Sequence, residues 1–109
     1  MRLSTLVLGL VAAVAFGDAA AAAVDPVAGR ALAKRCAPCH GIDGIAKQPH
    51  VPHIAGESVI YLAKQLKAFR SGERQNEQMS LMAQPLTDEQ IADLVAWYSS
   101  IEITAKLPE

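Results

Sequence analysis

The stretch that decides the fold is Cys36-Ala37-Pro38-Cys39-His40, a C-x-x-C-H motif. The spacing has a chemical reason, because two thiols so placed can each add to one of the two vinyl groups of a haem. The histidine that follows then places an imidazole beneath the iron as the proximal ligand. The chain has 2 cysteines in all, and both lie in this motif. The sequence therefore predicts one covalent haem c, held by Cys36 and Cys39, with His40 as an iron ligand.

Other uses of the two thiols are open. An oxidising compartment favours a Cys36–Cys39 disulfide, and C-x-x-C also occurs in thioredoxin-like redox pairs. Neither explains His40, and the chain lacks the strand–helix alternation that a thioredoxin fold needs. A zinc site would require two further ligands. His50 and His53 are available, but their spacing from the thiols fits no common zinc pattern.

Residues 1–23 have the features of a secretory signal peptide. The opening Met1-Arg2 is basic, residues 6–16 are apolar, and an alanine-rich stretch follows. We expect cleavage in that stretch, which leaves residues 24–109 as one small exported domain. The apolar run is shorter than the roughly 20 residues that span a bilayer. A retained N-terminal membrane anchor is the alternative.

Charge and size narrow the class of protein further. The formal net charge is −1, and no basic patch of the kind that binds nucleic acid is visible. A domain this small buries only a modest share of its surface and is marginally stable on its own. A buried haem would supply much of the missing apolar core, so we expect the haem-free chain to be poorly folded.

Three helices and no convincing strand are expected. Asp25 is an N-cap followed by proline at the first helical position. Apolar side chains at helical spacing mark the second helix, which Gly72 ends. The third opens with the capping box Thr87-Asp88-Glu89-Gln90. The expected helices cover about residues 25–36, 58–71 and 87–101, with loops over 41–56 and 71–86.

This layout resembles the class I c-type cytochromes, and most of all the small monohaem bacterial periplasmic branch whose diheme relatives carry two such domains in tandem. The matching stretches are C-A-P-C-H-G, P-H-I-A-G, Y-L-A-K-Q-L-K-A-F-R-S-G-E-R and M-S-L-M-A-Q-P-L-T-D-E-Q-I-A-D-L. Together they extend over essentially all of residues 24–109. The resemblance implies an all-α class I cytochrome c fold, with three main helices around one covalently bound haem.

The resemblance also implies the partner of the proximal histidine. A ligating imidazole usually donates its second N–H to a carbonyl, which fixes the ring. In the family, the proline of a P-x-L-x-G segment supplies that carbonyl. The stretch Pro52-His53-Ile54-Ala55-Gly56 is similar to that segment, so Pro52 is the expected acceptor for His40.

The distal iron ligand is expected before the last helix. Met79 is the implied ligand, because the sequence around it resembles the family's pattern of ligand methionine, alanine and leucine ahead of the capping box. Met82 is the alternative; otherwise it would pack near the haem edge. His50 and His53 are rival ligands, and bis-histidine ligation would lower the reduction potential. Both histidines are expected to be solvent-exposed on the proximal side.

The resemblance suggests packing roles elsewhere. The first helix should cross the last at Gly29, where a missing side chain permits close approach, and Trp97 should fill the crossing. Arg70 and Arg74 resemble family positions near the haem pocket. A contact with a haem propionate is one interpretation for the two arginines, but we expect them to be solvated cations.

The function expected from these features is that of a soluble periplasmic monohaem one-electron carrier, not an enzyme. Its partners would be redox proteins such as an oxidase, a cytochrome complex or a dehydrogenase. It would contact the membrane peripherally at most and bind no nucleic acid. One alternative is a cytochrome subunit of a periplasmic dehydrogenase complex. Another is a peroxidase or gas-binding haem protein, but no distal histidine–arginine pairing is visible in the sequence.

Overall fold

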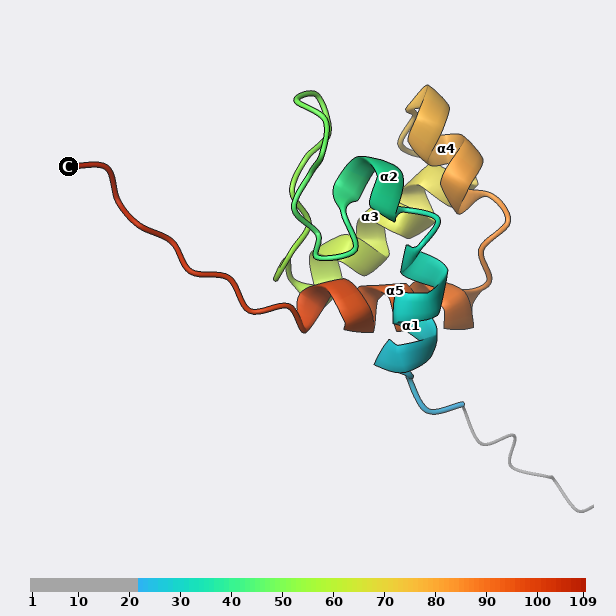
Figure 1. Cartoon of the computed structure of the whole chain (residues 1–109). Helices are drawn as coiled ribbons and strands as arrows, with labels where there is room; N and C mark the ends of the chain where they lie inside the picture. The colour runs from blue at the N-terminus through green and yellow to red at the C-terminus, as the bar shows by residue number, and fades with distance from the viewer. Residues whose placement is uncertain (1–21) are drawn as a thin grey trace, which may run out of the picture.

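The computed structural model describes residues 22–109, which form five helices (Figure 1). No strand occurs among these residues, so the all-α prediction is confirmed. Residues 1–21, which hold most of the expected signal peptide, lie outside the described part. None of the described helices is both long enough and apolar enough to cross a membrane. The helices are α1 (Pro26–Ala33), α2 (Ala37–His40), α3 (Val59–Ser71), α4 (Glu77–Ala83) and α5 (Asp88–Ser99).

The three longer helices begin at capping residues, of which Asp25 and Thr87 are the predicted ones. The Asp25 side chain accepts a hydrogen bond from the Val27 amide, with Pro26 in the first turn of α1. Ser58 caps α3 in the same way, and Gly72 ends that helix with a φ of +83°. Thr87 and Gln90 form both bonds of the capping box of α5. Side chains therefore satisfy backbone N–H groups that the helix cannot bond itself.

The first helix is shorter than predicted. It ends at Ala33 rather than Cys36, because the Arg35 and Cys36 amides bond to the carbonyls three residues earlier, at 3.0 and 2.9 Å. Such tight turns interrupt the α-helical ladder. The chain then restarts as α2, with a proline in its first turn, where proline fits without breaking a bond. The haem motif therefore occupies its own short helix.

The predicted loop over residues 71–86 is wrong in its middle, where α4 lies. Asn76 is its N-cap and accepts a bond from the Met79 amide at 2.9 Å, and Glu77 places a negative charge in the first turn. Helical spacing places Met79, Met82 and Ala83 on one side. Both methionines are half-buried and Ala83 is fully buried, so this side faces inward. The helix has only seven residues, and the burial of this inward side stabilises it.

The core forms where α5 crosses α1 and α3. Gly29 lies so close to α5 that a Cβ at this position would sit 1.9 Å from the Asp93 carbonyl oxygen and 3.1 Å from the Trp97 Cβ. The structure thus bears out the predicted crossing, with half-buried Trp97 beside it. The Arg30 guanidinium stacks over the Trp97 ring, 5.5 Å from its centroid. The central core residues are Ala33, Leu62, Leu86, Ile91, Leu94, Val95 and Tyr98.

The two arginines make contacts within the chain, and they differ in exposure: Arg74 is exposed, as the sequence suggests, whereas Arg70 is half-buried. Arg70 donates to the Leu86 carbonyl at 2.8 Å and forms an ion pair with Asp88, so it joins the end of α3 to the start of α5. Arg74 donates to the Gln65 side chain at 2.6 Å and stacks over the Phe69 ring, 4.6 Å from its centroid. Both guanidiniums are therefore occupied by contacts within the chain.

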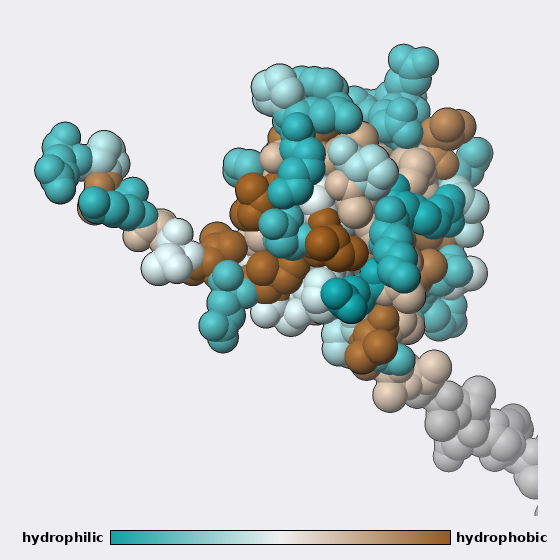
Figure 2. All heavy atoms as spheres, in the orientation of Figure 1, coloured by the Kyte–Doolittle hydropathy of each residue, from teal (hydrophilic) through white to brown (hydrophobic). Residues whose placement is uncertain are grey.

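The C-terminal segment leaves the helical domain after α5 and extends away from it (Figure 1). Figure 2 shows hydrophobic groups where this segment departs. Ile103 and Leu107 within it are 62% and 85% exposed. The expected helix through residue 101 stops short, at Ser99, although half-buried Ile101 still packs against the core.

Candidate haem site

His40 is the last residue of α2 and is buried. Its Nδ1 lies 3.0 Å from the Pro52 carbonyl oxygen, which is the contact that the sequence predicts. A carbonyl can only accept, so Nδ1 carries the proton and Nε2 is the nitrogen with a free lone pair. The ring is therefore held in the tautomer that leaves Nε2 available to a metal.

The available donor atoms fit a haem iron and its two thioether links. His40 Nε2 has no hydrogen-bond partner among the described residues. No side-chain nitrogen or oxygen of those residues is both fully enclosed and unpaired, so this nitrogen faces open space. Cys36, the N-cap of α2, and Cys39, within α2, are free thiols and half-buried. An imidazole nitrogen and two adjacent thiols are the donor set that a covalent haem needs.

The two thiols have different surroundings. Burial raises the pKa of the Cys36 thiol above its usual 9.0, while Arg35 acts in the opposite direction and Cys39 adds to the rise. The Gln48 side-chain amide lies 3.7 Å from the Cys39 sulfur, within reach of a weak hydrogen bond. No sequence pattern distinguishes Gln48, because it lies nine positions from Cys39 in an irregular loop.

The structure offers little to the alternative uses of the thiols. Cys36 and Cys39 are not joined by a disulfide. Within residues 22–109, no three His, Cys, Asp or Glu side chains gather where they could hold a metal ion. A zinc site built from the two thiols with His50 or His53 is therefore not assembled. The same residues contain no strand, which a thioredoxin fold requires.

The loop over residues 41–56 brings Pro52 to His40, and we call it the proximal loop. Its first residue, Gly41, has a φ of +77°, a conformation that favours glycine, and it turns the chain sharply after the histidine. The Lys47 amide then bonds back to the Cys39 carbonyl at 2.9 Å. The Ile54 and Ala55 amides both bond to the Gly44 carbonyl, at 2.8 and 3.1 Å. The loop is thus closed by its own backbone around the Pro52 carbonyl.

Two aromatic residues of α5 hold the start of the proximal loop. Trp97 Nε1 donates to the Ile42 carbonyl at 2.9 Å, and the Tyr98 hydroxyl donates to the Gly41 carbonyl at 3.1 Å. Tyr98 is buried, and burial raises the pKa of its phenol far above 10, so the hydroxyl stays a donor. Its polar role joins residues 57 positions apart, and no local pattern reports such a contact.

The predicted distal methionines lie on α4, which packs against α3. Met79 and Met82 are one helical turn apart, and both are half-buried while Leu81 between them is 69% exposed. A sulfur from either residue is an available soft ligand. Their shared face does not distinguish the two methionines, and only the sequence pattern favours Met79 as the ligand.

The two rival histidines lie on the proximal loop and are exposed, as expected. The Nδ1 of His53 accepts a bond from the Ala46 amide at 2.8 Å. Since the same loop supplies the Pro52 carbonyl, it approaches the His40 ring from its Nδ1 side. Nε2, the nitrogen that would bind the iron, is at the opposite edge of that ring. The loop that carries His50 and His53 therefore lies on the side of His40 that faces away from the iron. This placement argues against bis-histidine ligation.

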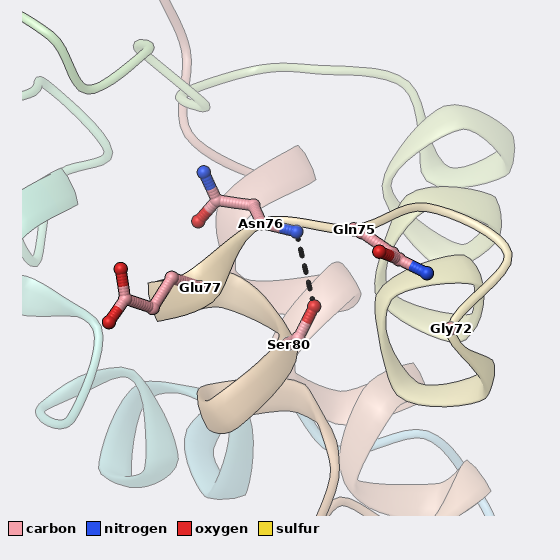
Figure 3. Close-up of a pocket in the computed structure, with 5 residues that line it drawn as sticks. All are labelled: Gly72, Gln75, Asn76, Glu77 and Ser80. Atoms are coloured by element: carbon pink, nitrogen blue, oxygen red, sulfur yellow. Dashed lines mark hydrogen bonds between the residues drawn. The ribbon is translucent and has the colours of Figure 1, made fainter.

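A surface pocket lies where α3 ends and α4 begins, and it is separate from the residues above. Figure 3 shows the hydrogen bond from the Asn76 amide to the Ser80 hydroxyl, 3.2 Å long, which joins two of the pocket's lining residues. None of the predicted haem-binding residues lines it. The lining residues are Gly72, Gln75, Asn76, Glu77 and Ser80.

Comparison with known proteins gives consistent matches. The sequence model of the family described as Cytochrome c matches residues 26–102. Cytochrome c-554(548) of Halomonas halodenitrificans is 43% identical over 72% of this chain and 98% of its own length. The thiosulfate dehydrogenase electron acceptor of Thiomonas intermedia is 39% identical over 68% of this chain and 35% of its own length.

Solved structures agree with the sequence matches. Reduced recombinant cytochrome c4 from Pseudomonas stutzeri superposes with a TM-score of 0.68 at 34% identity, over 73% of this chain and 47% of that one. The chain therefore spans nearly all of one relative and half or less of the two longer ones.

Proposed function

The chain belongs to the cytochrome c family, and from this premise we propose that it is a periplasmic monohaem one-electron carrier. It is an electron-carrier cytochrome of class I fold with covalently bound haem c. When bound, the haem iron supplies one-electron oxidation and reduction. We propose which residues hold the haem, in which compartment the protein acts and which class of partner it serves.

The proposal assigns a role to each residue of the site. Cys36 and Cys39 form the two thioether bonds, His40 Nε2 is the proximal ligand, and Met79 is the distal ligand, with Met82 as the alternative. The Pro52 carbonyl fixes the imidazole and increases its donor strength. The main observation in support is the buried His40 imidazole, whose Nδ1 bonds to the Pro52 carbonyl oxygen at 3.0 Å and whose Nε2 is therefore available to the iron. The two free thiols lie next to it in the sequence.

An iron with both axial positions filled by protein has no open site for a substrate. We therefore infer that the chain transfers electrons without catalysing a reaction of its own. When the haem is bound, the apolar core and the two half-buried methionines would limit the access of water to the iron, which lowers the local dielectric. A peroxidase or gas-binding protein would instead require a vacant or easily displaced distal ligand.

Redox proteins are the expected partners, and export by the N-terminal segment would place the exchange in the periplasm. A specific observation favours a second candidate role. One relative is described as the electron acceptor of a thiosulfate dehydrogenase, and it shares 39% of residues over the aligned region. We therefore also propose a periplasmic dehydrogenase as electron donor, with this chain either its free acceptor or a bound subunit.

One spectrum and one extraction test the central proposal. The oxidised protein should show a weak absorption band at the red end from methionine sulfur to iron, and carbon monoxide should not bind the reduced protein. Acid acetone should leave the colour with the protein, because the haem is covalently attached. Colour extracted into the solvent, or ready binding of carbon monoxide, would contradict it. Co-purification at native expression levels separates a free carrier from a dehydrogenase subunit.

A further inference from the structure

Tyr98 contacts both ends of the proximal loop. Its hydroxyl donates to the Gly41 carbonyl at 3.1 Å, and its own backbone carbonyl accepts from the Gly56 amide at 2.9 Å. Gly41 directly follows His40, and Gly56 closes the stretch that carries Pro52. One residue of α5 thus bonds to both ends of the loop.

The contact between His40 and Pro52 depends on that closure. The Pro52 residue itself is exposed, so packing does little to hold its carbonyl in place. What places the carbonyl 3.0 Å from His40 Nδ1 is the course of the loop between its two ends. The hydroxyl bond of Tyr98 is buried, where water does not compete for the carbonyl.

We propose that the Tyr98 hydroxyl is a positioning residue for the proximal ligand, because it holds the loop in the one arrangement that aligns Pro52 with His40. The proposal rests on ligation of the iron by His40, as set out above. A hydrogen bond from Nδ1–H to a carbonyl makes the imidazole a stronger donor. A stronger donor favours ferric iron. Loosening the bond should therefore make the reduction potential more positive.

The test is Tyr98→Phe in the complete haem protein, which keeps the buried ring and removes only the hydroxyl. The Gly41 carbonyl retains its bond from the Gly44 amide at 3.2 Å, so the variant is expected to fold. Two quantities are measured. The first is the exchange rate of the His40 Nδ1 proton in the reduced protein by NMR, and the second is the reduction potential.

Thr87→Ala is the matched control for lost stability. It breaks the capping box of the same helix at its exposed end, about 16 Å along the axis from residue 98. It should lower the thermal midpoint without affecting the proximal loop. Any faster proton exchange in this control reflects global unfolding, and only the excess in Tyr98→Phe reports on the His40–Pro52 bond.

The inference predicts that Nδ1 exchange in Tyr98→Phe is at least about tenfold faster than in the control, with a more positive potential. Exchange no faster than in Thr87→Ala would overturn it and leave Tyr98 a purely structural residue. Failure of the ligand assignment would be recognised separately. In that case the wild-type His40 ring signals would lack the large shift that a haem imposes on a ligand bound above its centre.

Discussion

Gly29 and Asp93 approach so closely that no side chain fits between their backbones. A Cβ on residue 29 would lie 1.9 Å from the Asp93 carbonyl oxygen, far inside contact distance. The oxygen belongs to the backbone of α5, so no rotation of a side chain can relieve the overlap. The two helices therefore lie as near to each other as they do only because residue 29 is glycine.

Gly29→Ala should destabilise the protein although alanine is the better helix former. Helix propensity alone would favour alanine by about 0.5–1 kcal/mol. Overpacking at the crossing should outweigh it, with a net loss of about 1–3 kcal/mol and a thermal midpoint lower by several degrees. Ala31→Gly, on the exposed side of the same helix, measures the propensity term by itself. A midpoint raised by Gly29→Ala would show that α1 can move away from α5 at no cost.

Met79→Ala should abolish the sulfur–iron absorption band and open the reduced iron to carbon monoxide. Met82→Ala is the matched control, because it removes the same side chain one turn along the same face of α4. The control should keep the band and exclude carbon monoxide. If Met82→Ala abolishes the band and Met79→Ala does not, Met82 is the ligand. If both variants keep the band, neither methionine is the ligand, and the histidines of the proximal loop become the candidates.

The haem-free chain should lack a fixed tertiary structure. A Cys36→Ala/Cys39→Ala variant removes both attachment points and leaves the surrounding apolar residues without the group that fills the space between them. Small domains without such a group have little core to stabilise them. Near-ultraviolet circular dichroism should be weak, and heating should give no cooperative transition. A sharp transition in this variant would mean that the contacts between α1, α3 and α5 suffice on their own.

The ion pair between Arg70 and Asp88 should make stability depend on pH in the acid range. A hydrogen bond and the charge of Arg70, with a smaller contribution from Lys67, lower the pKa of Asp88 below its usual 3.8. Because the folded-state pKa is the lower one, the stabilisation is present in full above the unfolded-state value. It is lost as the pH falls through the folded-state value.

Asp88→Asn tests this directly. At neutral pH the variant should have a lower thermal midpoint than the wild type. The gap should begin to narrow as the pH falls below about 4 and should close once the pH is below the lowered folded-state pKa of Asp88. Glu89→Gln removes a neighbouring acidic side chain and serves as the control. A gap that persists unchanged at low pH would assign the loss to packing rather than to charge.

The sequence predicted the parts of this fold that are coded locally. Asp25, Ser58 and Thr87 begin helices because each side chain bonds an amide two or three positions ahead, and such pairs are visible in the sequence. The helix α4 escapes prediction because the resemblance to the family assigns residues 71–86 to a loop that carries the ligand methionine. Its signals were present all the same: Asn76 as cap and an inward face one turn long.

The parts that escaped prediction depend on contacts between distant residues. Arg70 reaches the Leu86 carbonyl across 16 positions, which no local pattern distinguishes from a solvated arginine. Tyr98 reads as an apolar member of a helical stripe, while its hydroxyl has a partner 57 positions away. The motif predicted the chemistry of the site, but the network that holds the proximal loop required the structure.

The position of Trp97 gives the molecule a built-in optical reporter. It is the single tryptophan of the chain, and its indole N–H bonds to the carbonyl two residues beyond His40 at 2.9 Å. A haem attached at Cys36 and Cys39 would lie close enough to absorb the energy of the excited indole. The tryptophan fluorescence of the folded holoprotein should therefore be almost fully quenched. Opening of the proximal loop, or separation of α5 from α1, would move the Trp97 indole away from the haem and restore its fluorescence. Fluorescence would thus follow local opening in real time without any added label.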